Sequence, residues 1–394
     1  MKSKHLFTAT FFLLPARLLL ILLMLGGPTF SFAQICFNPA ANYPGAGTHP
    51  EPYSLASADF NSDGKLDLAV ANEHTHNGSL LLGNGDGTFR AATVFTAGEV
   101  PVSIVTADFN ADNKADLAVV NSASTTISIL LGKGDGTFTE TNFSLGNALI
   151  AIISADFNKD GKVDLVVANS ATAASGLNQV LLLRGNGDGT FGAATGFAVG
   201  EYATSLTSAD FNADKKLDLA VTNGVDETVS ILLGDGAGGF GASKVFAVDS
   251  FPRSVASADF NGDRKLDLVV ANYGSNNASV LIGNGDGTFK SAVNFPAGTL
   301  PHSVIASDFD SDGNVDFAVA NAGSANVSVM HGNGAGGFGA AVNFAVGNLS
   351  LTIITADFNG DSKPDLATAN YGSDHVSVLL NCAITTRQKK RGLN

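Results

Sequence analysis

Apolar and polar residues alternate in short segments that recur about every 49 residues along the chain. In one copy, residues 103–109 alternate, and residues 116–121 form a short apolar run rich in β-branched side chains. Residues 127–131 form another short segment, a turn rich in Gly and Asp follows at 132–138, and a last segment ends at Phe143. Short segments of this kind, separated by turn residues, are typical of strands. Each repeat is therefore predicted to form four antiparallel strands.

Seven such repeats predict a closed ring of sheets. A four-stranded sheet of this size cannot bury both faces alone, whereas sheets arranged around an axis cover one another and leave no long exposed edge. We therefore expect an all-β fold, a seven-bladed β-propeller with four-stranded antiparallel blades. A linear solenoid is the alternative, but it would need distinct capping segments at its ends, and the sequence shows none.

An acidic nine-residue segment, here called the cassette, joins the first two predicted strands of every repeat. The seven cassettes start 49, 48, 54, 49, 49 and 49 residues apart, at Asp59, Asp108, Asp156, Asp210, Asp259, Asp308 and Asp357. Each carries oxygen-bearing side chains at positions 1, 3, 5 and 9. Packing a core does not require four such side chains in a tight loop, whereas Ca²⁺ takes six to eight oxygen ligands. The cassettes therefore predict up to seven bound Ca²⁺ ions, with metal-free Asx-turns as the alternative.

The charge of the chain follows from the same segments. The formal net charge is −14, and 22 of the 36 acidic residues lie in the cassettes. The acidity therefore belongs to the predicted metal sites rather than to the whole surface. Since the repeats contain no basic stripe, nucleic acid is not an expected partner.

Residues 1–33 have the pattern of an export signal. Positive charges at residues 2–17 precede or flank an unbroken apolar run at 18–25, which is shorter than the ~20 residues that span a bilayer. Small residues precede a predicted cleavage site between Ala33 and Gln34. We expect a secreted protein, extracellular or at the cell surface, with an uncleaved membrane anchor as the alternative. No other segment is a transmembrane candidate, so we expect no stable membrane span.

The two ends of the chain together replace one turn. A Gly-x-Gly-Asp-Gly-Thr-Phe turn, or a looser form of it, occurs six times for seven cassettes. At the seventh position the chain reads Asn381-Cys382, and near its mature start it reads Cys36-Phe37, with Phe37 aligned to the Phe that ends each turn. We predict a Cys36–Cys382 disulfide, which an oxidising compartment permits; two unpaired thiols are the alternative. The propeller then occupies residues 34–384, closed by both termini, and a basic tail follows at 385–394.

The pattern Asp-x-Asn-x-Asp-x-Lys-x-Asp-Leu, followed by the Gly-Asn-Gly-Asp-Gly-Thr-Phe turn, resembles the FG-GAP/VCBS repeat family over about residues 37–381. This family includes the N-terminal propellers of integrin α subunits. The resemblance implies calcium ligands at cassette positions 1, 3, 5 and 9 and at the backbone carbonyl of position 7. A lysine ammonium cannot bind Ca²⁺, which agrees with the use of only the carbonyl at position 7.

The implied ligands are Asp59, Asn61, Asp63, Lys65 and Asp67; Asp108, Asn110, Asp112, Lys114 and Asp116; Asp156, Asn158, Asp160, Lys162 and Asp164; Asp210, Asn212, Asp214, Lys216 and Asp218; Asp259, Asn261, Asp263, Lys265 and Asp267; Asp308, Asp310, Asp312, Asn314 and Asp316; and Asp357, Asn359, Asp361, Lys363 and Asp365.

Position 6 of the cassette differs among the copies. It is Gly in three cassettes and Asn113, Lys215, Arg264 or Ser362 in the others. A residue with a Cβ atom destabilises the loop if its φ is positive. We therefore expect weaker binding at the sites that begin at residues 210, 259 and 357.

The face opposite the cassettes is the candidate recognition surface. Antiparallel strands place the cassettes and the Gly-Asp turns on one face, whereas the loops on the other face differ from copy to copy. Loops that vary could recognise a partner, and drift of a solvated surface is the alternative. We single out Tyr273, Tyr371, His375 and Arg253 as the candidate partner surface. We interpret His74 and His76 as exposed loop residues, because no third ligand for a metal pair is identifiable.

Two classes of function fit these features. The first is a monomeric, secreted calcium-binding module for binding or adhesion, with an extracellular protein or glycan as partner. The second is a polysaccharide-processing lyase or hydrolase, or an enzyme-associated module, that uses the face opposite the cassettes. The chain has no Trp, which weakens the glycan case because sugar faces commonly stack on aromatic rings. The sequence shows no nucleophile elbow or phosphate loop, so it identifies no catalytic residue.

Overall fold

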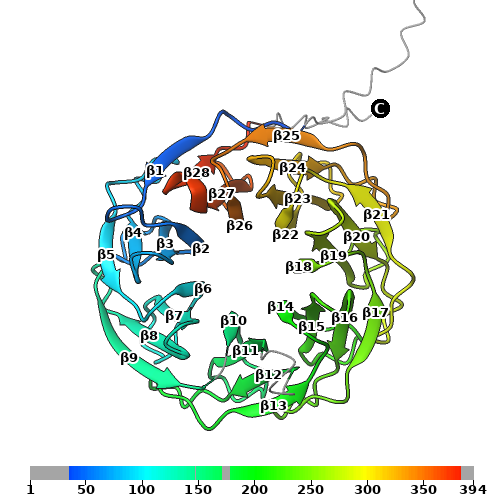
Figure 1. Cartoon of the computed structure of the whole chain (residues 1–394), viewed down its shortest axis with the longest axis horizontal. Coiled ribbons are helices and arrows are strands. Elements are labelled where there is room, and N and C mark those ends of the chain that lie inside the picture. Colours follow the sequence, from blue (N-terminus) through cyan, green and yellow to red (C-terminus); the bar gives the residue numbers. More distant parts are fainter. Residues whose placement is uncertain (1–34, 147, 171–177, 383–394) are drawn as a thin grey trace, which may run out of the picture. The chain divides into compact units, whose positions relative to one another are not determined.

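A computed structural model describes residues 35–146, 148–170 and 178–382. These residues form seven four-stranded antiparallel sheets arranged around a central axis (Figure 1). The predicted export signal, its cleavage site and the basic tail lie outside the described residues. The one helical element of the described part is a three-residue 3-10 turn, η1 (Tyr371–Ser373), so this part has no helix able to span a membrane.

The strands are β1 (Ala41–Pro44), β2 (Pro52–Ala58), β3 (Asp67–Asn72), β4 (Asn77–Leu81), β5 (Thr93–Thr96), β6 (Pro101–Ala107), β7 (Asp116–Asn121), β8 (Thr126–Gly132), β9 (Phe138–Ser144), β10 (Leu149–Ala155), β11 (Asp164–Ser170), β12 (Asn178–Leu183), β13 (Thr195–Ala198), β14 (Ala203–Ala209), β15 (Asp218–Asn223), β16 (Thr228–Leu232), β17 (Lys244–Ala247), β18 (Pro252–Ala258), β19 (Asp267–Asn272), β20 (Asn277–Leu281), β21 (Val293–Pro296), β22 (Pro301–Ser307), β23 (Asp316–Asn321), β24 (Asn326–Met330), β25 (Val342–Ala345), β26 (Ser350–Ala356), β27 (Asp365–Asn370) and β28 (His375–Leu379).

The sheets close into a ring. The innermost strand of each blade contacts the innermost strand of the next, from β2 through β6, β10, β14, β18 and β22 to β26, which contacts β2 again. The seventh blade has the order β1-β28-β27-β26. It therefore takes its outer strand from the N-terminus and its other three strands from the C-terminus. The predicted seven-bladed propeller with four-stranded blades is confirmed, and the solenoid alternative is excluded.

The burial of each strand follows its place in the blade. The second strand of every blade, such as β3 or β7, is buried along its whole length, as its β-branched run predicts. The Phe at cassette position 2 packs between blades: the Phe60 ring lies 5.8 Å from the Phe138 ring of the following blade, and Phe109 lies 5.7 Å from Phe191. Burying such a ring contributes about 2–3 kcal/mol. These contacts hold adjacent blades together.

The predicted closure of the ring is confirmed. Cys36 and Cys382 form a disulfide, with their Cα atoms 5.1 Å apart. A bridge between Phe37 and Asn381 replaces the Gly–Phe bridge that ends the third strand elsewhere, for example Gly83 with Phe89. In five other blades a Gly N–H of the turn donates to the carbonyl of the preceding cassette's Phe, as Gly136 does to Phe60 at 3.0 Å. In the seventh blade the Asn381 side-chain amide donates to the Phe309 carbonyl instead, at 2.8 Å.

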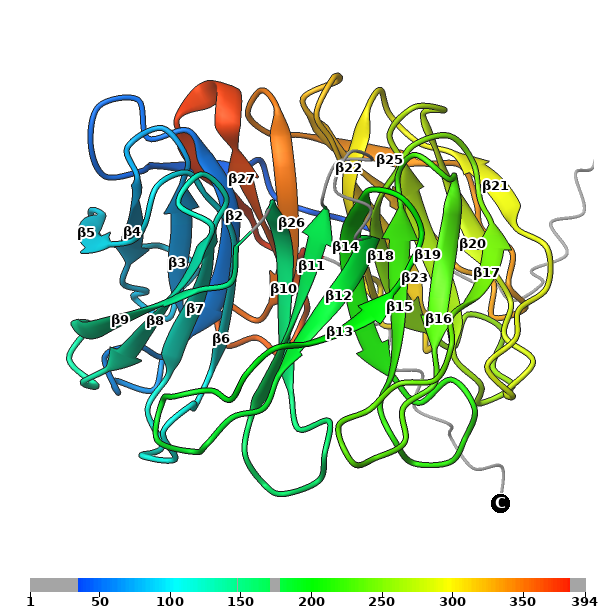
Figure 2. The ribbon, with the colours of Figure 1, turned by 60° about the horizontal axis from the view of Figure 1, so that its bottom comes forward.

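The connecting loops gather at the two ends of the strands (Figure 2). The hydrogen bonds from the Gly-Asp turns to the cassette Phe carbonyls place turns and cassettes on the same face, as predicted. The loops between second and third strands, and those between blades, lie at the other end. The cassettes and the varied loops are therefore separated by the length of the strands.

Candidate metal-binding loops and channel mouth

All seven cassettes adopt the same hydrogen-bonded loop. In the first, the Asp59 carboxylate accepts the N–H groups of Asp63 and Gly64 at 3.1 and 2.7 Å. Asn61 Oδ1 accepts the Asp63 N–H at 3.0 Å, and Asp63 Oδ1 accepts the N–H of position 7 at 3.0 Å. The same four bonds recur in the other six copies. The spacing of oxygen side chains therefore fixes one loop shape.

The Asp at position 9 anchors the loop to the blade. Asp67 is fully buried, and its two carboxylate oxygens accept the N–H groups of Phe60 and Gly83 at 2.9 and 2.8 Å. The equivalent Asp is fully buried in every cassette. Burial raises the pKa of these carboxyls, to about 6 for Asp116 and Asp365, although two N–H donors oppose the shift. Negative charge at position 9 is therefore costly unless a cation lies nearby.

The donor set of the cassettes fits a hard cation. The lysine ammonium of position 7 lies 3.2–4.0 Å from the carboxylate of position 5 in five cassettes, so it offers no ligand atom of its own. Carboxylate, amide and carbonyl oxygens remain, and these are the ligands that Ca²⁺ prefers. Each carboxylate oxygen that accepts one N–H retains a second lone pair.

Two cassette positions, rather than one, have positive φ. Position 6 has φ of 61° to 92° in all seven copies, which agrees with the expected backbone penalty for a residue other than Gly. Position 4 also has positive φ, from 59° to 76°, and the sequence did not indicate this. Five cassettes have Gly at one of the two positions. The second cassette has Ala111 and Asn113 at positions 4 and 6, and the fourth cassette has Ala213 and Lys215. These two loops therefore have no Gly where φ is positive.

We expect Lys215→Gly to raise the free energy of unfolding by about 1 kcal/mol, because it removes a Cβ atom from a left-handed residue. Chemical denaturation of metal-free protein measures this. Lys244→Gly is the matched control, since Lys244 is exposed on β17, where Gly should cost about 0.5–1 kcal/mol. Equal destabilisation by both changes would contradict the assignment of strain to Lys215.

One residue from each inner strand lines the central channel. These residues surround a cavity of about 150 Å³ and comprise Tyr53, Val102, Ile150, Thr204, Arg253, His302 and Leu351. A second layer follows directly along each strand and is mostly Ser. Its hydroxyls join neighbouring blades: Ser54 Oγ accepts the Ile104 N–H at 3.3 Å, and Ser254 Oγ accepts the Val304 N–H at 3.1 Å. The first layer varies in chemistry, whereas the second is part of the scaffold.

Six aromatic rings form a continuous row at the end of the channel opposite the cassettes. We call this row the aromatic belt. Successive ring centroids lie 6.3, 6.2, 6.2, 6.1 and 5.8 Å apart, in the order Tyr371, Tyr53, His302, Tyr273, Phe251 and Tyr202. All six side chains are half-buried. The Arg253 guanidinium lies 5.2 Å from the Phe251 ring centroid and 5.5 Å from that of Tyr273, within the range of cation–π attraction.

Three of the four residues proposed as a partner surface therefore come together, namely Tyr273, Tyr371 and Arg253. His375 lies instead on β28, where its Nδ1 pairs with the Asn370 side-chain amide at 3.1 Å. Tyr53 also belongs to the belt and was not predicted from the sequence. Tyr53 occupies the same place in the first repeat as Arg253 does in the fifth, so alignment of the repeats could have found it.

The ionisable side chains at the belt differ in their charge at physiological pH. The Nδ1–H of His302 donates to the Leu351 carbonyl at 2.6 Å. Burial and the nearby Arg253 charge lower the pKa of His302 to about 3, so it is neutral at physiological pH. Burial, with neighbouring Glu51 and Glu73, raises the pKa of Tyr371. Among the described residues Arg253 forms no ion pair, and its buried Nε has no hydrogen-bond partner. A guanidinium without a direct ion pair therefore lies at the channel mouth, whereas the Glu51 and Glu73 carboxylates lie near Tyr371 on the same belt.

His74 and His76 have other contacts. His76 Nδ1 accepts the Val100 N–H at 3.1 Å, and His74 lies 3.9 Å from the Glu51 carboxylate with 63% of its side chain exposed. Neither belongs to a three-ligand cluster within the part of the chain that the structure describes.

Solved structures with the same fold are distant in sequence. The structure of BBS1N in complex with ARL6DN, soaked with lead, is 14% identical, has a TM-score of 0.61, and covers 92% of this chain and 100% of its own. A streptogramin B lyase is 13% identical, with a TM-score of 0.61 and coverages of 87% and 97%. An inactive variant of virginiamycin B lyase from Staphylococcus aureus, with quinupristin, is 13% identical, with a TM-score of 0.59 and coverages of 87% and 99%. These likenesses show the fold alone.

Sequence comparison gives the family. No curated protein matches the chain. A family model described as an FG-GAP-like repeat matches six overlapping spans, at residues 59–119, 108–167, 156–221, 210–270, 259–319 and 308–368. Each span runs from one cassette into the second strand of the next repeat. The chain therefore belongs to the FG-GAP-like repeat family.

Proposed function

We propose that this chain is an exported, calcium-binding propeller that binds an extracellular protein through the aromatic belt and Arg253. The observation that carries the proposal is the belt itself, a row of six half-buried rings with a guanidinium at the channel mouth. The belt lies on the inner strands and varied loops, at the end opposite the uniform cassettes. This division assigns recognition to one face and metal binding to the other.

Arg253 indicates the chemistry of the ligand. Its charge contacts two aromatic faces but no carboxylate among the described residues. A guanidinium offers five N–H donors in a planar fork that matches a carboxylate. A partner that inserts an acidic side chain at the mouth would pair with the terminal NH₂ groups of the guanidinium, because the Nε atom is buried. The belt would then pack against the apolar surroundings of that side chain.

The residue types favour a protein over a glycan as partner. Tyr and Arg are enriched among the residues that contribute most to protein–protein binding. The rings also contact one another edge to face rather than presenting one flat platform, because the interplanar angles at Tyr53 and His302 are 82° to 89°. Sugar rings commonly stack flat on an open aromatic face, and this arrangement offers little such surface.

An array of extracellular-matrix proteins, acidic peptides and acidic glycans, read with calcium and with EDTA, tests the proposal. We expect a protein or acidic peptide to bind the wild type and Arg253→Gln to weaken that binding about 10- to 100-fold, the usual value of a charged hydrogen bond. The double change Tyr273→Ser and Tyr371→Ser should weaken it at least as much. Arg253→Gln should not alter the melting temperature greatly, because Arg253 has no ion pair to lose among the described residues.

Arg90→Gln is the matched control, because Arg90 is exposed at the opposite end of the first blade. It should bind as the wild type does. Ligands that bind all three variants equally would contradict the belt as the recognition surface. If only acidic glycans bind, the partner is a glycan and the proposal of a protein partner is wrong. Depolymerisation of those glycans by the chain would favour the enzyme alternative.

A further inference from the structure

The sixth repeat differs from the other six at three places, two in its cassette and one after its third strand. Position 3 is Asp310 instead of Asn, and position 7 is Asn314 instead of Lys. The residue before the turn that follows the third strand is His331, where the other blades have Leu, Ile or Arg. This loop therefore has four carboxylates and no lysine, whereas every other cassette has three carboxylates and at least one lysine. The need for a compensating cation is greatest here.

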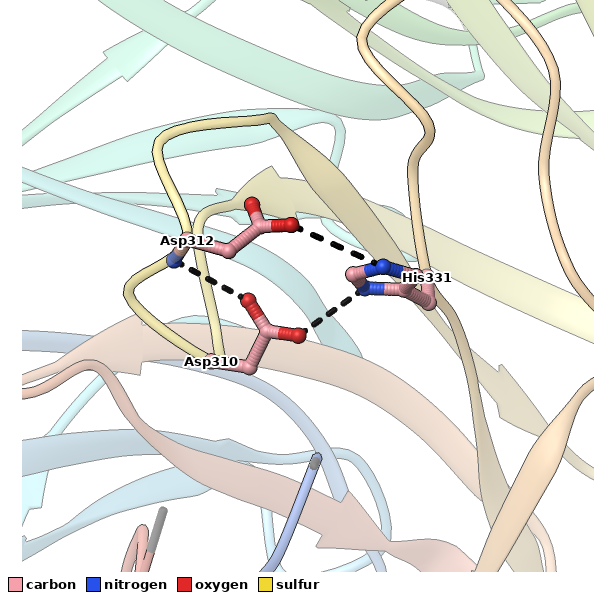
Figure 3. Close-up of side chains that lie close together, drawn as sticks. All are labelled: Asp310, Asp312 and His331. Carbon is pink, nitrogen blue, oxygen red and sulfur yellow. Dashed lines mark hydrogen bonds and ion pairs between the residues drawn. The ribbon is translucent and has the colours of Figure 1, made fainter. Parts of the chain in front are cut away.

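Two of the three departures, Asp310 and His331, meet beside Asp312 (Figure 3). The third, Asn314, donates a side-chain N–H to Asp312 Oδ2 at 2.9 Å. His331 Nδ1 lies 2.9 Å from Asp310 Oδ2 and 3.4 Å from Asp316 Oδ1, and Nε2 lies 3.6 Å from Asp312 Oδ2. Asp310 has no exposed surface, and its Oδ2 accepts no hydrogen bond. Among the described residues, three-ligand clusters with donor atoms within 4.8 Å occur only here: Asp310, Asp312 and His331, and also Asp308, Asp310 and Asp316.

The closure of the ring explains why His331 faces the cassette. In other blades the residue before the turn lies against a turn glycine of the following blade, as Leu131 does with Gly189 and Leu233 with Gly287. The seventh blade has no such turn, because the Cys36–Cys382 disulfide replaces it. An imidazole ring at position 331 is therefore free of this packing role and points toward Asp310 and Asp312 instead (Figure 3).

We propose that the sixth cassette is a Zn²⁺ site, with His331, Asp310 and Asp312 as ligands and with Asp308 and Asp316 beside them. Imidazole nitrogen suits Zn²⁺, whereas Ca²⁺ is bound by oxygen. Bonds of about 2.0–2.1 Å place the ligand atoms of a tetrahedral zinc ion about 3.3 Å apart. His331 Nδ1 lies 2.9 Å from Asp310 Oδ2 and 3.4 Å from Asp316 Oδ1, and one donor atom each from Asp310, Asp312 and His331 lie within 4.8 Å of one another. The His331 side chain is 35% exposed, which gives an ion access from solvent.

A second occupant of the same geometry is a proton. Protonated His331 paired with Asp310 would neutralise part of the cluster without any metal. A proton and a zinc ion compete for the same imidazole nitrogen, so zinc binding to the purified chain decides between them. The proposal is independent of calcium in the other six cassettes.

Metal-stripped protein should be titrated with ZnCl₂ by calorimetry in millimolar calcium, and metal content should be counted by elemental analysis. We expect one zinc ion per chain. His331→Leu installs the residue found at positions 82, 131, 233 and 380, and Asp310→Asn installs the residue of the other cassettes. Both changes therefore suit the fold. Each should weaken zinc binding at least about tenfold, because even the loss of a group that only hydrogen-bonds to a metal ligand commonly lowers metal affinity about 10- to 100-fold. His74→Leu removes an exposed histidine elsewhere and should bind zinc normally.

Zinc lost from both site variants and retained by His74→Leu would support the proposal. Equal zinc binding by all three variants would overturn it, as would the absence of zinc binding by the wild type at micromolar concentration. Zinc bound at this site in a chain that binds no calcium would contradict the calcium part of the proposed function and leave the zinc site intact.

Discussion

Removing calcium should lower the melting temperature by on the order of 10 °C or more. An ion that binds only the folded state stabilises it by about 2.7 kcal/mol per site at a hundredfold excess over Kd. Several cassettes together would contribute about 10 kcal/mol. With an unfolding entropy of about 2 cal/mol/K per residue over the ring, this corresponds to roughly 14 °C. The physical reason lies in the buried Asp at position 9, whose charge has two N–H donors but no cation in the metal-free loop.

The effect of chelation should be smaller at pH 5 than at pH 7. Burial raises the pKa of Asp116 and Asp365 to about 6 in the folded chain, above the ordinary value of 3.8. Because the folded state binds these protons more tightly, the metal-free protein gains stability as the pH falls from 7 through 6. The gain is about 1 kcal/mol per group between pH 7 and pH 5. Calcium opposes protonation, so the calcium-loaded protein should lack this gain.

Thermal melts in calcium and in EDTA at both pH values measure this prediction. Magnesium at the same concentration is the control for ionic strength, because its strict octahedral geometry and tightly held water suit these loops poorly. A melting temperature that chelation leaves unchanged at pH 7 would contradict calcium binding by the cassettes. A larger effect of chelation at pH 5 than at pH 7 would contradict the role of the buried Asp residues.

The fold could be predicted because the same local sequence patterns recur in each repeat. The β-branched run that becomes β7, the oxygen spacing of the cassette and the Gly-Asp turn each recur, so seven copies correct the ambiguity of any one. The ring closure could also be predicted, because the missing seventh turn coincides with Cys36 and Cys382. Both features depend on positions close in sequence or fixed by the repeat.

The features that escaped prediction depend on contacts between blades or on backbone angles. Tyr53 joins His302 and Tyr371 only when the first, sixth and seventh blades meet around the axis. His331 faces Asp310 because the adjacent blade lacks a turn, which no local pattern indicates. Positive φ at position 4 is hidden because Ser, Ala and Lys occupy it in five cassettes. Repeats reveal what the copies share, whereas specific sites arise where they differ.

Loss of the Cys36–Cys382 disulfide should loosen the closing blade before any other. The bond joins residues 346 apart in the sequence, and the chain-entropy relation gives about 5–6 kcal/mol for a loop of this length, as an upper value. Without the bond, β1 is held mainly by its four residue pairs with β28, from Ala41 with Val378 to Pro44 with His375. A strand that short is marginal by itself. Opening of β1 would also remove Phe37 from the Phe309 and Phe344 rings.

The double variant Cys36→Ser and Cys382→Ser tests this without leaving a reactive thiol. Hydrogen exchange should accelerate first at residues 41–44 and 375–379, while β3 and β7, which are buried throughout, keep their protection. The blade of β14 to β17 serves as the internal control, because it lies far from both termini in the ring. Non-reducing peptide mapping of the wild type should recover the Cys36 and Cys382 peptides as one linked species. Uniform acceleration in all blades would contradict local closure, because it would mean that the bond stabilises the ring as a whole rather than the blade that both termini build.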